Sequence, residues 1–180
     1  GVPVGHAFAR IEPVPMAAGS LAQAHRAWLH DGTAVVLKLR RPGIGEVVEA
    51  DLRLLARLAD IVDARVPDLT RFHLPEVVAQ FATSLRRELD FVAECRNAER
   101  IAGNFAGNPQ LLIPSVYWEW TRTSVAVQGF IDGIPANDPV ALSQAGVDIR
   151  QLAADGAGIV LQMVLEDGLF HADPHPGNLF

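Results

Sequence analysis

A short turn signal between two apolar runs places the strongest constraint on the fold of this 180-residue chain. The dipeptide Asp31-Gly32 separates residues 22–29, which alternate in polarity, from residues 33–40, which are mostly apolar and rich in valine. Asp-Gly between two such runs is typical of a β-hairpin. We therefore predict strands over residues 22–29 and 33–40, and a further strand over residues 6–12.

Helical patterns follow the predicted hairpin. Apolar residues recur at three- and four-residue spacing from Val47 to Val62, which predicts a helix that ends before Pro67. A second helix is predicted from Pro75 towards Gly103, because proline is well suited to the first turn of a helix. Three later elements are predicted by the same criteria, namely strands over 111–120 and 124–131 and a helix over 148–167.

The order of these elements predicts an α+β fold. Residues 1–131 would form a small β-rich lobe with long helices inserted over residues 44–103. Residues 132–180 would begin a larger, helical lobe. An apolar fraction of 49% and a charged fraction of 20% agree with an ordinary globular chain.

Composition and charge exclude several classes of protein. The net charge of −6 argues against a nucleic-acid partner. The most apolar stretch, residues 157–165, is shorter than the ~20 residues that a membrane span needs, and the first residues lack the pattern of a signal peptide. The single cysteine, Cys95, is compatible with a reducing compartment. We therefore expect a cytoplasmic location, with any membrane association through segments outside this chain.

The chain contains one lysine, Lys38, among fifteen basic residues. An ammonium group is a compact charge, whereas guanidinium is a broad planar fork, so a lone lysine among arginines indicates a task for the ammonium. Lys38 lies within an apolar predicted strand, where burial would demand a carboxylate or phosphate partner. Alternation of side chains along a strand also allows Lys38 to reach solvent.

Small residues join two of the predicted strands at Ala17, Ala18, Gly19 and Ser20. Such residues let the backbone approach a ligand closely, and consecutive N–H groups can cradle phosphate oxygens. A tight hairpin turn has the same composition, so both interpretations stay open.

An acidic group lies in the second predicted helix. Asp90 and Glu94 are four residues apart and would share one side of that helix, while Glu88 points elsewhere. Like charges at this spacing disfavour an isolated helix unless a cation or metal lies nearby. The neighbouring basic residues that could instead form a surface network with them are Arg86, Arg87 and Arg96.

The end of the chain is a loop rich in proline and glycine. Asp173 and Asn178 are five residues apart, the spacing of the protein-kinase catalytic loop, in which the aspartate is the base and the asparagine holds Mg²⁺. Asp173 with His171 and His175 would also suit a zinc or iron site. No further cluster of cysteine or histidine completes such a site, so metal-dependent hydrolysis is the weaker interpretation.

Together these motifs resemble the UbiB/AarF family of atypical protein-kinase-like ATPases, over about residues 10–180. The resemblance is carried by Ala17-Ala18-Gly19-Ser20, by Val36-Leu37-Lys38-Leu39-Arg40-Arg41-Pro42-Gly43, by Glu88-Leu89-Asp90 and by Asp173-Pro174-His175-Pro176-Gly177-Asn178. The last string is highly specific. The resemblance implies a protein-kinase-like fold and Mg²⁺-dependent phosphoryl chemistry that supports quinone or isoprenoid-lipid metabolism.

The resemblance also implies roles for the residues that bind nucleotide. Lys38, held by Glu94, would engage the α- and β-phosphates of ATP, and the loop from Ala17 to Ser20 would cover them. Gln128 and Phe130 would form the hinge beside adenine, where Gly129 replaces the glutamate common in the family.

Catalytic and regulatory roles are implied in the same way. Asp173 would be the catalytic acid or base and a metal ligand, and Asn178 would hold Mg²⁺. Glu88 and Asp90 would belong to the family's inhibitory and metal-coordinating apparatus.

The family's Lys-x-Gly-Gln segment would precede this chain, and its Asp-Phe-Gly motif would follow Phe180, so we expect the 180 residues alone to be inactive. The implied partners are ATP, a quinone or isoprenoid lipid, lipid-biosynthesis proteins and a membrane surface. A second hypothesis is a pseudokinase-like module, in which nucleotide switches the binding of lipid or partner proteins. The metal-binding aspartate beyond Phe180 would distinguish the two.

Overall fold

The computed structural model describes residues 3–170, 179 and 180. The chain divides into two compact units, one of residues 1–94 and 117–127 and the other of residues 95–116 and 128–180. The lobe boundary expected between residues 131 and 132 concerns the lobes of a complete kinase-like domain, and it stays a prediction.

The first unit is built on a β-sheet. Its strands are hydrogen-bonded in the order β1 (Arg10–Ile11), β3 (Ala22–Trp28), β4 (Ala34–Arg40) and β5 (Val125–Gly129), and β2 (Ala17–Ala18) also pairs with β3. Strand β3 is antiparallel to β1, β2 and β4. One face of the sheet carries the core, formed by Ala27, Val35, Leu37 and Val127. The strand over 6–12 was predicted too long, because Val4–Ala7 form the short helix α1.

The Asp31-Gly32 turn joins β3 to β4 and confirms the predicted hairpin. The Leu29 amide donates to the Thr33 carbonyl at 2.9 Å, and the Thr33 amide donates to the Asp31 carboxylate at 2.9 Å. Gly32 has a φ of 85°, a conformation that costs glycine little. The turn therefore fixes the register in which Ala24 lies opposite Lys38.

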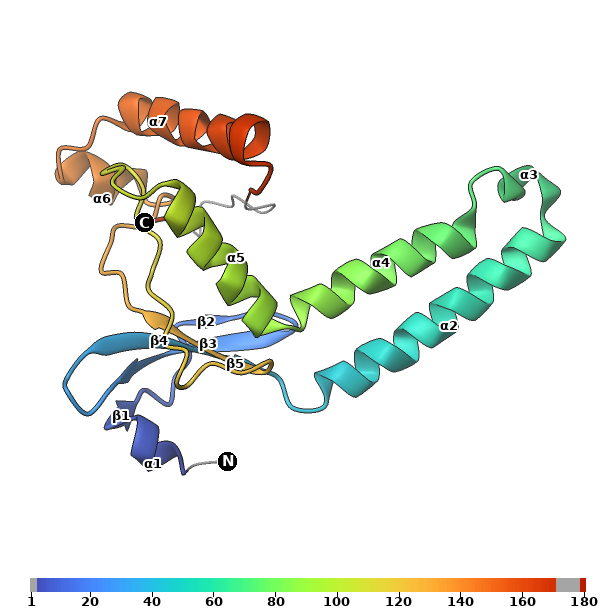
Figure 1. Cartoon of the computed structure of the whole chain (residues 1–180), viewed down its shortest axis with the longest axis horizontal. Coiled ribbons are helices and arrows are strands. Elements are labelled where there is room, and N and C mark those ends of the chain that lie inside the picture. The colour runs from blue at the N-terminus through green and yellow to red at the C-terminus, as the bar shows by residue number, and fades with distance from the viewer. Residues whose placement is uncertain (1–2, 171–178) are drawn as a thin grey trace. The chain divides into compact units, whose positions relative to one another are not determined.

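A helical hairpin follows β4. Helix α2 (Ile44–Arg65) and helix α4 (Leu74–Glu88) run side by side, joined at their far end by α3 (Pro67–Thr70) (Figure 1). Their contact buries Val48, Leu52 and Ala82, in keeping with the apolar spacing read from the sequence. The expected stop before Pro67 is confirmed, since α2 ends at Arg65.

The second long helix was predicted as one element, and the structure shows two. Helix α4 ends at Glu88, and α5 (Phe91–Asn104) begins after a joint formed by Leu89 and Asp90. The Asp90 carboxylate accepts hydrogen bonds from the Val92 amide at 3.0 Å and the Ala93 amide at 3.3 Å. An aspartate that caps the first amides of a helix starts a new element, and that local preference overrides the continuous apolar pattern.

The pair of strands predicted over 111–120 and 124–131 forms only in part. The second exists as β5, but the first is reduced to an isolated bridge between Val116 and Gln128. Pro114 supplies no backbone donor to a ladder, and the chain turns where the Trp120 amide donates to the Tyr117 carbonyl.

The second unit is mainly helical over the residues that the structure describes. It contains most of α5, α6 (Pro139–Gln144) and α7 (Ile149–Gln162), which continues as a π-helical turn over Met163–Asp167. The helix predicted over 148–167 is thus confirmed, with Asp148 as its N-cap. Ile101, Phe105 and Met163 form the buried core of this unit. Within the described part of the chain, no helix is long and apolar enough to cross a bilayer.

Candidate functional site

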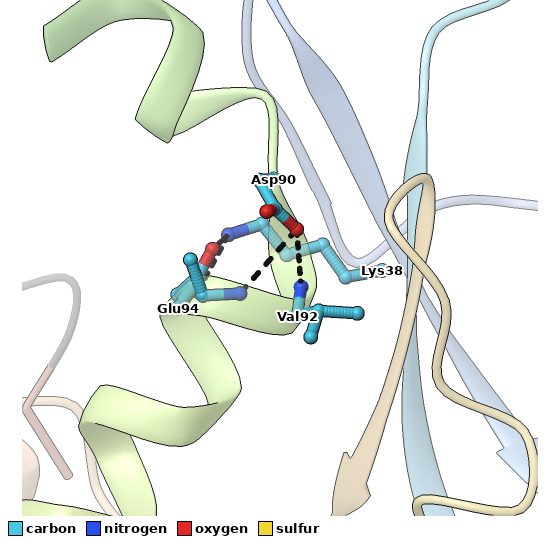
Figure 2. A network of polar contacts seen from close by, with 5 residues as sticks. Lys38, Asp90, Val92 and Glu94 are labelled. Atoms are coloured by element: carbon cyan, nitrogen blue, oxygen red, sulfur yellow. Dashed lines mark hydrogen bonds and ion pairs between the residues drawn. The ribbon is translucent and has the colours of Figure 1, made fainter. Parts of the chain in front are cut away.

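The lone lysine meets a carboxylate at the start of α5. The Lys38 Nζ atom on β4 donates to both carboxylate oxygens of Glu94, at 2.8 Å to Oε1 and 2.7 Å to Oε2 (Figure 2). The partners are 56 residues apart in sequence, so the ion pair connects the sheet to α5. The contact expected between Lys38 and Glu94 is therefore present.

The sheet around Lys38 is lined by small side chains. Ala24 lies directly opposite Lys38 on β3, and Ala17 lies opposite Ala24 on β2. Residues paired in this way project from the same face of a sheet. The face that carries Lys38 is opposite the apolar core, and of these three residues only the lysine extends beyond its Cβ atom. A ligand could approach the ammonium over the two alanines.

The joint between α4 and α5 orients Glu94. Asp90 caps α5, and the Glu94 amide donates to the Asp90 carbonyl at 3.2 Å in the first turn. Phe91, with 1% of its surface exposed, anchors the same turn, and the Lys38 ammonium lies 4.7 Å from its ring centroid. A cation over an aromatic face is stabilised by the quadrupole of the ring. Lys38 is thus held by both a carboxylate and a ring.

The pair stays accessible although both partners are held. The side chains of Lys38 and Glu94 are 32% and 45% exposed, so this is a partly solvated ion pair and not a buried one. An ammonium has three donors, and Glu94 takes two of them. The third can bind an additional anion, which is the chemistry that a phosphate-binding lysine needs.

The small-residue loop is a tight β-hairpin. Ala17 and Ala18 form β2, and the Gly19 amide donates to the Ala22 carbonyl at 2.9 Å. The Gly19 carbonyl accepts a hydrogen bond from Arg41 Nε at 3.0 Å. Gly19 therefore uses both of its backbone polar groups within the protein. Ser20 is exposed at the tip, and any role of the loop over phosphates stays a prediction.

The acidic group does not form the arrangement expected from one helix. Glu88 is the exposed last residue of α4, whereas the Asp90 carboxylate is used as the cap of α5. Arg86 does not compensate these acids: its Nε and Nη2 atoms donate to Glu49 on α2 at 2.7 and 2.9 Å. The Arg86 guanidinium, by its hydrogen bond, lowers the pKa of Glu49 below its usual value. Regulatory roles for Glu88 and Asp90 stay predictions.

The residues predicted to contact adenine lie at the end of β5, the strand next to β4 in the sheet. Gln128 is half-buried and forms a bridge to Val116, and the Gly129 amide donates to the Ser115 carbonyl at 2.9 Å. Phe130 follows the strand directly. This is the place in the sheet where the sequence predicted a hinge, and its contact with a nucleotide stays a prediction.

The catalytic-loop residues Asp173 and Asn178, together with His171 and His175, lie outside the described residues. The structure therefore tests neither the roles predicted for them nor the alternative zinc or iron site. Among residues 3–170, 179 and 180, no group of three or more histidine, cysteine, aspartate or glutamate side chains could hold a metal ion.

Sequence reasoning missed two contributors to the site. Phe91 was given no role within the helix predicted from Pro75 towards Gly103, and Arg40 was noted only as part of a motif. Arg40 Nη1 donates to the Leu89 carbonyl at 2.9 Å, at the joint between α4 and α5. A signal for Arg40 exists, because residues two apart on a strand share a face, and Arg40 follows Lys38 by two.

Comparison with known proteins agrees with this arrangement. A family model described as the ABC1 atypical kinase-like domain matches residues 1–180. Proteins named "Probable protein kinase UbiB" from Marinobacter nauticus and Azotobacter vinelandii are 43% and 40% identical to all 180 residues. The chain covers 33% and 34% of their lengths, so it spans about a third of the curated relatives it matches.

A solved structure has the same fold. It is described as the complex of Rv3197 with erythromycin from Mycobacterium tuberculosis, and it matches 99% of this chain with a TM-score of 0.74 at 25% identity. The chain covers 44% of that protein. The strand lysine paired with a helix glutamate, the full-length family match and the shared fold lead to one conclusion: this chain belongs to the family of ABC1 atypical kinase-like domains, with UbiB proteins among its relatives.

Proposed function

We propose that this chain is the nucleotide-binding part of a UbiB-type atypical kinase or ATPase that uses ATP and Mg²⁺. The observation that carries the proposal is the ion pair between Lys38 and Glu94 on an alanine-lined face of the sheet. In kinases a strand lysine held by a helix glutamate positions the nucleotide phosphates. The Lys38 ammonium, which has three donors, would also bind the phosphates here.

The remaining roles belong to the same proposal. The tip of the β2–β3 hairpin would lie over the phosphates, and Gln128 and Phe130 would contact adenine. Asp173 and Asn178 would hold Mg²⁺, whose charge offsets that of the phosphates, and Asp173 would act as the catalytic acid or base. Glu88 and Asp90 would take part in regulation.

The names of the relatives support the biological setting. Proteins called UbiB are 43% and 40% identical to the whole of this chain, and the name supports a kinase-like role in ubiquinone biosynthesis. A quinone or isoprenoid lipid, lipid-biosynthesis proteins and a membrane surface are the partners that we propose for the complete protein.

The direct test is the thermal stability of the full-length protein with and without Mg²⁺-ATP. Ligand at about 100 times its dissociation constant should add about 2.7 kcal/mol of stability. We expect this stabilisation in wild type and its loss in Lys38→Ala. Arg86→Ala is the matched control, because it also removes the cation of a two-point ion pair but leaves the sheet face unchanged.

Turnover separates the two hypotheses. Wild type should hydrolyse or transfer phosphate, whereas Asp173→Asn should bind nucleotide without turnover. A wild-type protein that is folded but not stabilised by Mg²⁺-ATP would refute nucleotide binding. Stabilisation without turnover by wild type would instead favour the pseudokinase-like module.

A further inference from the structure

Arg40 contributes to the candidate site from the strand that carries Lys38. It follows Lys38 by two residues on β4, so both side chains project from the same face of the sheet. The strand end is fixed as well, because the Arg40 amide donates to the Ser124 carbonyl at 3.0 Å. The backbone of Arg40 is therefore fixed, and its guanidinium extends from there towards the α4–α5 joint.

The atom that Arg40 holds is the carbonyl of Leu89, at 2.9 Å from Nη1. Leu89 is the C-cap of α4 and is buried. The last carbonyls of a helix have no partner within the helix and carry partial negative charge, so a guanidinium there is favourable. Arg40 thereby ties the end of α4 to the strand that carries Lys38.

The same joint sets the position of Glu94. Asp90 follows Leu89 directly and caps α5, and Glu94 lies in the first turn of that helix. On the other side of Asp90, the Phe91 amide donates to the Thr123 carbonyl at 3.2 Å. The two residues that flank Asp90 are thus both held from outside the helices, Leu89 by the Arg40 side chain on β4 and Phe91 by the Thr123 carbonyl in the turn before β5.

We propose that Arg40 is a positioning residue: by holding the Leu89 carbonyl it keeps α5 in the place where Glu94 meets Lys38. The functional importance of Arg40 rests on the proposed nucleotide site, but its effect on the Lys38–Glu94 contact can be tested without nucleotide. The competing explanation is that burial of Leu89 and Phe91 alone fixes the joint, in which case Arg40 adds nothing to the ion pair.

The reactivity of the Lys38 amine gives a direct readout. An amine-reactive ester acylates only the uncharged amine. The two hydrogen bonds to Glu94 hold Lys38 as a charged ammonium and so slow its acylation. In the full-length protein without nucleotide, peptide mapping by mass spectrometry would follow acylation at Lys38. Glu94→Gln, which removes the carboxylate charge, should be acylated several-fold faster than wild type and calibrates the assay.

Arg40→Met should be acylated nearly as fast as Glu94→Gln, since it keeps the aliphatic stem but not the donors. Arg40→Lys retains a positive charge and N–H donors, and it should return the rate at Lys38 most of the way to wild type. Arg86→Met makes the same chemical change at the Glu49 ion pair of the helical hairpin and should react at the wild-type rate.

Two results would overturn the proposal. One is a wild-type rate in Arg40→Met, and the other is equal acceleration in Arg40→Met and Arg86→Met, which would indicate general loosening. If Arg40→Met does not fold, Arg40→Leu and Arg86→Leu, which also lack donors, replace the methionine pair with the same expectations. Failure of wild type to bind Mg²⁺-ATP would contradict the proposed function. The acylation rates would still test the role of Arg40, because they are measured without nucleotide.

Discussion

Two ion pairs of similar geometry have different surroundings in this protein. Lys38 and Glu94 join a strand to a helix at the candidate site, and Arg86 and Glu49 join the two helices of the α2–α4 hairpin. Both pairs are two-point contacts between partly exposed side chains. Ion pairs between exposed side chains contribute little to stability because solvent screens them, so neither is needed to hold the fold. The difference is that Lys38 also lies on an aromatic ring and on an alanine-lined face.

The α4–α5 joint is held by hydrogen bonds from several parts of the chain, whereas the α2–α4 hairpin is held mainly by the packing of its two helices against each other. At the joint, Arg40, Asp90 and Thr123 all form hydrogen bonds with the chain between Leu89 and Ala93. In the hairpin, α2 and α4 both begin without a side-chain cap. We expect substitutions at the joint to affect stability and binding more than matched substitutions in the hairpin.

The largest expected effect is at Phe91. Replacing this residue, which is 1% exposed, with alanine should cost about 3–5 kcal/mol, because a large cavity would form beneath Lys38. Phe81 on the hairpin is 51% exposed, and Phe81→Ala should change stability by about 0.5 kcal/mol or less. Urea unfolding measures both. Equal losses at the two phenylalanines would break the contrast between joint and hairpin.

Exchange of the two cations should give the next largest effect. Lys38→Arg preserves the charge but replaces the compact ammonium by a planar fork, and we expect ATP to bind at least about tenfold more weakly, a loss of about 1.4 kcal/mol. Arg86→Lys should leave the dissociation constant unchanged. Titration with a fluorescent ATP analogue tests both, and wild-type affinity in Lys38→Arg would argue against direct contact between Lys38 and phosphate.

Loss of the α5 cap should have a moderate effect. Asp90→Ala removes the acceptor for two amides and should cost about 1 kcal/mol. Asp90→Asn keeps an acceptor oxygen and should lose little. Hydrogen exchange of the Val92 and Ala93 amides measures the change locally. Unaltered protection in Asp90→Ala would show that the contacts of Leu89 and Phe91 position α5 without the cap.

The smallest effect concerns pH and the hairpin. The hydrogen bond from Arg86 lowers the pKa of Glu49 from its usual value of 4.5. A carboxylate with a lowered folded-state pKa stabilises the protein above its unfolded-state pKa, and this contribution is lost as the pH falls through the folded-state value. The thermal midpoint of wild type should therefore decline slightly more than that of Glu49→Gln between pH 6 and pH 3. Parallel declines would mean that the pair contributes nothing measurable.

Sequence reasoning was most successful where local signals and the fold agree. Asp31-Gly32 predicted the β3–β4 hairpin, and the resemblance to the UbiB/AarF family predicted Glu94 as the partner of Lys38. The joint was harder to predict, because Leu89 and Val92 continue the three- and four-residue apolar spacing of one helix, which Asp90 interrupts by capping α5. The spacing of Arg40 from Lys38 indicates that both side chains share one face of the strand. Its partner could not be predicted, because that partner is a backbone carbonyl 49 residues away and every residue has one.

The hydrogen bond between Arg40 and the Leu89 carbonyl has a consequence for how such a protein can be re-engineered. The chain leaves the sheet after β4, passes through α2, α3 and α4, and returns to within hydrogen-bond distance of its point of departure. An inserted segment whose two ends lie close together can change in length or sequence with little strain on the rest of the protein. The segment between Arg41 and Leu89 is therefore a natural graft site, where a helical pair of another length could be exchanged while Lys38 and Glu94 stay in contact.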